Sequence, residues 1–203
     1  MALSSFLSDY DLLRLMMAGN EEAFTILYRR RQGGIYRFAI QMSGSESIAE
    51  DVTQEVFLLL MREAAGYDPE RGSLSAYLYG IARNFVLRRL QQDQRFAAID
   101  DEKIDLHADG DRFTARADLL ADLTKSETVE LVRAAVLSLP PRYREVVVLC
   151  DLQEVNYADA AVIMGCAVGT VRSRLHRARA LLAEKLRATV EEPRPVTTAR
   201  CFA

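Results

Sequence analysis

The sequence predicts an all-α fold, in which two small helical domains are joined by an acidic linker. Apolar residues recur at helical spacing along most of the 203-residue chain, without convincing alternating apolar runs or an Asn-Gly hairpin turn. The hydrophobic periodicity weakens in the middle of the chain, where aspartates accumulate. We therefore expect a helical domain at 9–95, an acidic linker at 96–126, a helical domain at 127–188 and a loose tail at 189–203.

Turn residues divide the first domain into four helices. Gly19-Asn20, Gly44-Ser45 and the segment from Gly66 to Gly72 interrupt the helical periodicity. We predict helices at 9–18, 21–42, 46–64 and 73–94.

The second domain is expected to contain four further helices. Pro140-Pro141 is well placed to open a helix, so the β-branched run that follows at 146–148 belongs to a helical pattern. We predict helices at 127–138, 141–152, 157–164 and 168–187, with a further candidate in the linker near 114–123.

The composition indicates a globular protein whose charge is unevenly distributed. Hydrophobic residues make up 50% of the chain and charged residues 27%, which excludes wholesale disorder. The net charge is −3, yet the segment from Cys166 to Val190 holds six basic residues and one acid. No segment resembles a membrane span or a secretion signal, so we expect a cytoplasmic protein without membrane insertion.

The histidines and cysteines argue against metal or cofactor chemistry. Three cysteines without a Cys-x-x-Cys spacing disfavour a disulfide framework or a zinc site. A di-iron helical enzyme would need Glu-x-x-His pairs, and Ile104 and Ser173 stand three residues before the two histidines. We therefore predict no catalytic residues, no metal and no cofactor.

Residues 157–171 fit a helix-turn-helix. Ala161 supplies the small residue of the tight helix contact, and Gly165 suits a left-handed turn. Val171 is placed to pack the second helix against the first, and Asn156 is placed to cap the first helix. Cys166, at the apolar position of the turn, is more simply a small buried residue than a redox sensor.

The second helix of this motif has an apolar side and a basic, hydroxylated side. Val171, Leu175 and Ala178 define the apolar side. The other side suits the major groove of DNA, although a solvated basic face is the alternative. Its candidate DNA-binding residues are Gly169, Thr170, Arg172, Ser173, Arg174, His176 and Arg177.

The helix expected at 46–64 carries an anomaly opposite its apolar face. Leu58 and Met61 stand there among carboxylates, which indicates a protein-binding surface unless the domain's own loops cover them. The candidate binding residues on and beside this surface are Asp51, Gln54, Glu55, Leu58 and Met61.

Aromatic residues and arginines gather around the turn-rich loop at 66–73. Tyr67, Tyr77, Tyr79 and Phe85 lie near several arginines, an arrangement that suits stacking on unpaired bases. Core packing is the alternative for each tyrosine taken singly.

Four motifs together resemble bacterial sigma factors of the extracytoplasmic-function (ECF) type, which keep the family's regions two and four. The motifs cover residues 49–57, 75–84, 137–145 and 168–179, in the order and spacing of that family. Tyr77 stands where the family usually has Trp, and Asp159-Ala160 where it more often has Glu-Ile. Neither departure overturns the resemblance.

The resemblance implies a role for each surface. Asp51, Gln54, Glu55 and Met61 would dock on the clamp coiled coil of core RNA polymerase, and region four would also touch the flap. The helix-turn-helix residues would read the minus-thirty-five duplex. The minus-ten element would be captured and melted by Tyr67, Arg71, Ser73, Tyr77, Arg83 and Asn84.

These expectations describe a promoter-specificity subunit of RNA polymerase, with promoter DNA and core polymerase as partners and an anti-sigma factor as a further expected partner. The alternative is a stand-alone helix-turn-helix regulator that acts without polymerase. Leu58 and Met61 discriminate between the two, because a stand-alone regulator needs no polymerase-docking face.

Overall fold

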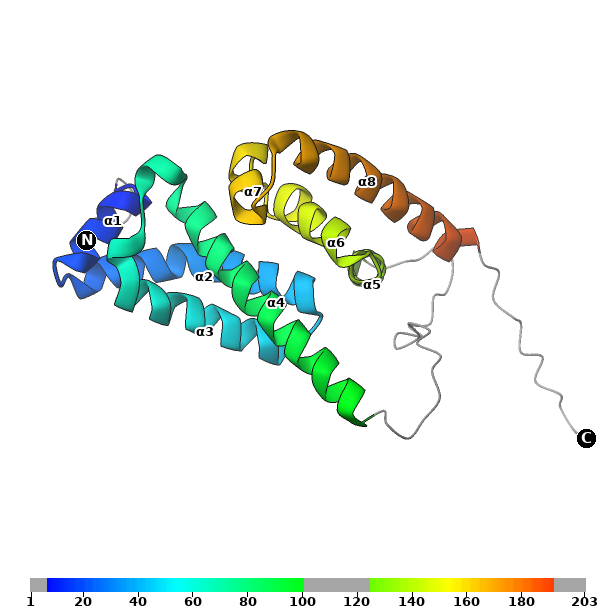
Figure 1. The fold of residues 1–203 in the computed structure, drawn as a ribbon, viewed down its shortest axis with the longest axis horizontal. Coiled ribbons are helices and arrows are strands. Elements are labelled where there is room, and N and C mark those ends of the chain that lie inside the picture. The colour runs from blue at the N-terminus through cyan, green and yellow to red at the C-terminus, as the bar shows by residue number, and fades with distance from the viewer. Residues whose placement is uncertain (1–6, 101–124, 192–203) are drawn as a thin grey trace, which may run out of the picture.

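The computed structural model describes residues 7–100 and 125–191, and the regular structure within these ranges is entirely helical (Figure 1). The all-α prediction is confirmed there. The N-terminal bundle comprises α1 (Asp9–Met17), α2 (Glu21–Ser43), α3 (Glu46–Glu63), the short turns η1 (Ala64–Gly66) and η2 (Pro69–Arg71), and α4 (Leu74–Asp100). The C-terminal bundle comprises α5 (Lys125–Leu137), α6 (Pro141–Val147), the π-helical turn η3 (Val148–Leu152), α7 (Tyr157–Met164) and α8 (Val168–Glu191).

Most helix ends fall within two residues of the predicted positions, because short polar side chains and glycines mark them. Ser8, Asn20 and Ser45 each accept a hydrogen bond from a backbone N–H in the first turn of the helix that follows. Two helices continue past their predicted ends, α4 to Asp100 and α8 to Glu191. No glycine or proline interrupts the chain over these extensions, so nothing local stops the helix. The candidate helix near 114–123 lies outside the described residues.

The N-terminal bundle is held by apolar packing and by one shared carboxylate. Phe38 and Leu27 of α2 are fully buried, together with Val56 of α3 and Leu78 of α4. Asp9, in the first turn of α1, accepts hydrogen bonds from two consecutive arginines of α2, at 2.7 Å from Arg30 Nη1 and 2.5 Å from Arg31 Nε. This carboxylate fixes α1 against α2.

The C-terminal bundle contains the predicted helix-turn-helix. Gly165 ends α7 with φ +62°, in the left-handed region that favours glycine. Asn156 Oδ1 accepts the N–H of Asp159 at 2.8 Å and so caps α7, as its position predicted. Val171, Leu175 and Ala178 of α8 are buried, which leaves the opposite side of the helix facing outward.

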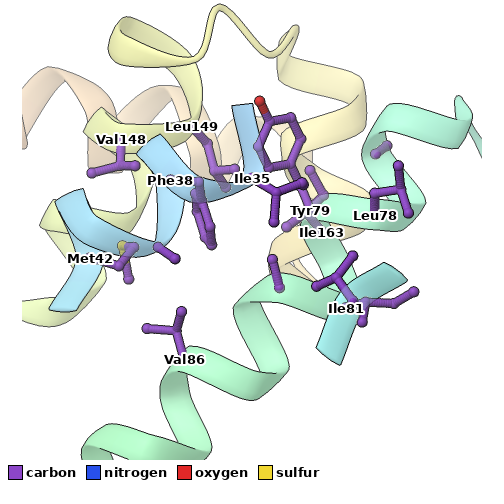
Figure 2. Packing of buried hydrophobic residues seen from close by; sticks show 14 of the residues in the cluster. Ile35, Phe38, Met42, Leu78, Tyr79, Ile81, Val86, Val148, Leu149 and Ile163 are labelled. Carbon is purple, nitrogen blue, oxygen red and sulfur yellow. The ribbon is translucent and has the colours of Figure 1, made fainter. Parts of the chain in front are cut away.

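The two bundles share one apolar core. Phe38 of α2 and Tyr79 of α4 pack in the same cluster as Leu149 of η3 and Ile163 of α7 (Figure 2). Polar links reinforce this contact. Tyr79 Oη donates to Gln153 Oε1 at 3.2 Å, and Gln153 Nε2 donates to Gln41 Oε1 at 2.8 Å. The predicted division into separate domains had suggested no such packing.

We expect Gly165→Ala to destabilise the protein by about 1–2 kcal/mol. A Cβ at this position meets nothing within 4 Å, so the cost is the left-handed backbone alone. Gly80→Ala is the matched control, because Gly80 lies inside α4 with equally open space around it. That change should stabilise the protein by up to about 1 kcal/mol. Urea unfolding of both variants measures the difference, and equal free energies of unfolding would contradict the assigned turn.

Candidate protein and nucleic-acid interfaces

An open groove between α2 and α3 exposes three of the predicted protein-binding residues, Gln54, Leu58 and Met61. Leu58 is 37% exposed and Met61 is 49% exposed, so the loops of the domain do not cover them. Gln54 borders the same groove. Aromatic rings line it, with Tyr28 and Phe57 in edge-on contact at 4.7 Å between ring centroids. The groove is therefore a preformed apolar surface with a polar rim.

Sequence reasoning missed the α2 side of this groove. Phe24, Tyr28 and Tyr36 line it at intervals of four and eight residues, which puts them on one stripe of the helix. This stripe is distinct from the buried core stripe of α2, which includes Ile35 and Phe38. A second apolar stripe on one helix is the signal that could have revealed the groove.

The structure divides the predicted protein-binding set between two faces of α3. Asp51 and Glu55 do not line the groove and turn instead toward Arg89 of α4. Arg89 Nη2 lies 2.9 Å from Glu55 Oε1 and 3.7 Å from Asp51 Oδ2. These carboxylates thus form an ion-pair cluster beside the apolar groove.

An aromatic cluster fixes the loop between α3 and α4. The rings of Tyr67 and Tyr77 lie 5.5 Å apart, and Tyr10 extends the cluster at 6.3 Å from Tyr67. Burial raises the pKa of Tyr67, so its phenol stays protonated and donates to the carbonyl of Gly72 at 3.0 Å. Three residues of the predicted base-binding set keep one face of this region open, with Arg71 and Asn84 exposed and Tyr77 half-buried.

Two other members of that set face the C-terminal bundle. Ser73 caps α4 by accepting the N–H of Ala76 at 3.1 Å, and its hydroxyl donates to Asp159 Oδ2 of α7 at 2.8 Å. Arg83 forms an ion pair with Glu145 of α6. The predicted set therefore does not form one open surface in this structure.

The predicted duplex-reading side of α8 is open. Gly169, Arg172, Ser173, His176 and Arg177 are exposed, whereas Thr170 and Arg174 are half-buried. Because Val171, Leu175 and Ala178 are buried, the basic side of α8 points away from the core. A protruding helix of this kind, preceded by α7, has the shape that enters a major groove.

Two stretches of the chain match models of one protein family. Residues 27–96, which run from α2 into α4, match Sigma-70 region 2, and residues 130–182, which include the helix-turn-helix, match Sigma-70 region 4. A sigma factor named SigM from Mycobacterium tuberculosis is 34% identical over 179 residues, which span 88% of this chain and 85% of that protein. The chain belongs to the ECF family of RNA polymerase sigma factors.

Further comparisons agree with this assignment. SigE of Mycolicibacterium smegmatis, another ECF sigma factor, is 33% identical over 161 residues, which span 79% of this chain and 60% of that protein. The solved structure of the sigma factor RpoE in complex with the anti-sigma factor NepR, from Bartonella quintana, is 25% identical. It aligns with a TM-score of 0.61 and covers 79% of this chain and 93% of that one.

The described residues of this sigma factor include no helix that is long and apolar enough to cross a membrane. Cys150 is half-buried, and burial raises the pKa of its thiol to about 11, so the thiolate is scarce at neutral pH. Cys166 is only partly buried in the turn, less than its apolar position had suggested.

An ion pair neutralises one arginine beside the predicted duplex-reading side of α8. Arg179 donates to both carboxylate oxygens of Asp151, at 3.1 and 2.6 Å, and this hydrogen bonding raises the pKa of Arg179. Arg179 and Tyr157 line a hollow together with Arg172 and His176. Sequence reasoning did not single out Tyr157 as a lining residue of this hollow; in such motifs the first helix crosses the phosphate backbone.

We expect Asp151→Asn to strengthen duplex DNA binding and to steepen its salt dependence. Freed from the carboxylate, Arg179 adds one cation to the hollow, and one further phosphate contact changes the slope of log K against log salt by about −0.9. Titration of a labelled duplex at several salt concentrations measures this slope. Glu130→Gln is the charge-matched control, because Glu130 pairs with Arg133 on the exposed surface of α5. Equal slopes for the two variants would place Arg179 away from the duplex.

Proposed function

We propose that this sigma factor docks on core RNA polymerase through the α2–α3 groove and thereby directs initiation at specific promoters. The observation that carries the docking site is the exposure of Leu58 and Met61 over an aromatic floor. A stand-alone regulator needs no polymerase-docking face, so this surface favours the sigma factor over that alternative. Apolar anchors inside a polar rim are typical of protein interfaces.

The promoter elements are divided between the two bundles in this proposal. The basic side of α8 reads the minus-thirty-five duplex, where arginines bind guanine edges or phosphates. The loop at 67–73 and the exposed face of α4 capture the minus-ten strand, because aromatic rings replace the stacking that a base loses when the duplex opens. Asn84 supplies an amide that both donates to and accepts from an extruded base.

The remaining parts of the proposal concern partners and location. We infer an anti-sigma factor as a partner, supported by the likeness to RpoE, whose solved structure holds the anti-sigma factor NepR. The polymerase clamp coiled coil is the proposed occupant of the groove, and the flap contacts the C-terminal bundle. The sigma factor acts in the cytoplasm and has no catalytic activity of its own, since nucleotide transfer belongs to the polymerase.

We expect Gln54→Ala combined with Met61→Ala to weaken binding to core polymerase by about 30-fold or more. Interface hot spots cost at least about 2 kcal/mol when truncated, and both side chains border the groove. Fluorescence anisotropy of labelled sigma factor titrated with core polymerase measures the dissociation constant.

A second methionine provides the control for this experiment. Met17 of α1 is 54% exposed and does not line the groove, so Met17→Ala should leave the affinity unchanged. Circular dichroism verifies that each variant keeps its helicity. An unchanged affinity of the double variant, with intact helicity, would rule out the groove as the docking site.

The two promoter surfaces should fail at different steps of initiation. Arg174→Ala and Arg177→Ala should weaken promoter recognition by the holoenzyme. A base-reading arginine would cost about 1–3 kcal/mol and relax the preference at one position. Asn84→Ala should leave closed-complex binding nearly intact and reduce the permanganate reactivity of minus-ten thymines.

A pre-melted promoter separates these roles. It should rescue Asn84→Ala only in part, because the base contact is still missing, and should not restore minus-thirty-five preference to the arginine variants. Loss of duplex binding by Asn84→Ala, with normal melting among the complexes that form, would contradict the division of labour.

A further inference from the structure

A positively charged hollow of about 400 Å³ lies where α2 and α4 meet the loop that follows η3. Its volume is within the range of small-molecule sites, and it is separate from the α2–α3 groove and from the hollow beside α8. Arg30, Arg31 and Arg37 of α2 line it, whereas Glu154 is its single acidic lining residue. An excess of cations around a hollow favours an anionic ligand.

Gly34 keeps the floor of this hollow open. It shares one stripe of α2 with Arg30 and Arg37, at intervals of four and three residues. A Cβ at this position would meet Tyr79 Oη at 2.9 Å, which is too close for a side chain unless its neighbour shifts. The missing side chain thus lets the Tyr79 hydroxyl line the hollow beside these arginines.

Asp9 holds Arg31 so that one nitrogen of its guanidinium group faces the hollow. Asp9 Oδ2 accepts a hydrogen bond from Arg31 Nε at 2.5 Å and also pairs with Nη2. The remaining nitrogen, Nη1, donates to the Ser75 hydroxyl oxygen at 3.4 Å, and Ser75 lines the hollow. Because Ser75 accepts this bond, its own O–H can donate to a bound anion. Asp9 is shared between Arg30 and Arg31, so a net positive charge remains.

Arg37 supplies a second cation. Its side chain is exposed, and no carboxylate within residues 7–100 and 125–191 pairs with it. Burial raises the pKa of Tyr79, and the charges of Arg31 and Arg37 both oppose this rise. The two guanidinium groups therefore act on the same part of the hollow. Glu154 is exposed and forms no ion pair within these ranges, so it leaves both cations available.

We propose that this hollow binds a diphosphate group, either as free pyrophosphate or as part of a nucleoside diphosphate, through Arg31, Arg37 and Ser75. Guanidinium groups favour phosphate because their paired N–H donors match two phosphate oxygens. The helical rise separates Arg31 and Arg37 by about 9 Å along α2, which suits two linked phosphates better than one. None of the three residues belongs to the proposed docking or promoter surfaces, so the site is independent of the proposed function.

Isothermal titration calorimetry of the full chain tests this site, with pyrophosphate, orthophosphate and ADP as separate probes in magnesium-free buffer. The variants are Arg37→Gln, which removes the exposed cation, and Ser75→Ala, which removes the hydroxyl donor. The charge-matched control is Arg29→Gln, because Arg29 is an exposed arginine of the same helix that does not line the hollow. Circular dichroism checks that each variant keeps its helicity.

The wild-type chain should bind one pyrophosphate, and more tightly than orthophosphate. Arg37→Gln should weaken this binding by about tenfold or more, because it removes a hydrogen bond between charged groups. Ser75→Ala should weaken it by about threefold, as the loss of one neutral donor does. Arg29→Gln should match the wild type. Tighter binding of ADP than of pyrophosphate would identify a nucleoside diphosphate as the source of the group, and the reverse order would identify free pyrophosphate.

Several results would overturn the site. These are the absence of binding by both pyrophosphate and ADP, equal affinity for orthophosphate and pyrophosphate, and equal losses in Arg37→Gln and Arg29→Gln. Arg177→Gln, on the exposed basic side of α8, tests for binding elsewhere, and a loss of affinity there but not in Arg37→Gln would also contradict the proposal. If Arg37→Gln lost helicity, the half-buried Ser75→Ala would decide by itself.

Discussion

Two adjacent, oppositely charged residues of α6 fix how the bundles sit together. Arg144 and Glu145 both face inward, and each finds its partner on the N-terminal bundle. Arg144 Nη1 donates to the carbonyl of Met42 near the end of α2 at 2.8 Å, while Nη2 donates to the carbonyls of Leu137 and Leu139. A guanidinium at the carbonyl ends of α2 and α5 is also favoured by the helix dipoles. Glu145 pairs with Arg83 of α4.

Because these charged groups are buried, their pairing restricts the position of α6 relative to the N-terminal bundle. Desolvation by burial lowers the pKa of Arg144, and among the described residues its Nε has no hydrogen-bond partner. Shifting α6 would leave two charges without partners in an apolar environment, which is far more costly than an exposed mismatch. The orientation of α8 follows from α6, because the two helices pack together along the C-terminal bundle. The direction of the basic α8 surface therefore depends on contacts made by α6.

Local signals explain why the sequence predicted the individual elements so well. Helix ends are marked by residues that act on backbone groups only a few positions away, such as the caps Ser8 and Asn156 and the left-handed Gly165. These signals can therefore be recognised from the local sequence alone. The exposure of Leu58 and Met61 was also predictable, since two apolar residues among carboxylates contradict a simple solvated face. The exposed basic side of α8 was predictable from the helical spacing of its apolar residues.

Contacts between distant segments were not predictable in the same way. Nothing beside Asp159 in the sequence indicates that it binds Ser73, 86 residues away. The helical period placed Asp51 and Glu55 near Leu58, and only the position of Arg89 shows that the acids turn toward α4. Arg83 is a cation next to aromatic residues in the sequence, which is typical of a DNA-binding residue, yet its partner in the structure is Glu145. Pairing between elements depends on packing angles that no local pattern specifies.

The open groove and the polar contacts between the bundles together indicate an order of events at the polymerase. Because the groove is open while Ser73 and Arg83 bind carboxylates of the C-terminal bundle, docking at the groove does not require the bundles to separate first. Docking energy is then available to shift the packing of the two bundles. Moving a two-state equilibrium from 1:99 to 99:1 requires about 5.5 kcal/mol of differential binding, which a few interface hot spots supply. Polar links such as Ser73–Asp159 suit this exchange, since DNA and solvent can replace each hydrogen bond when the bundles part.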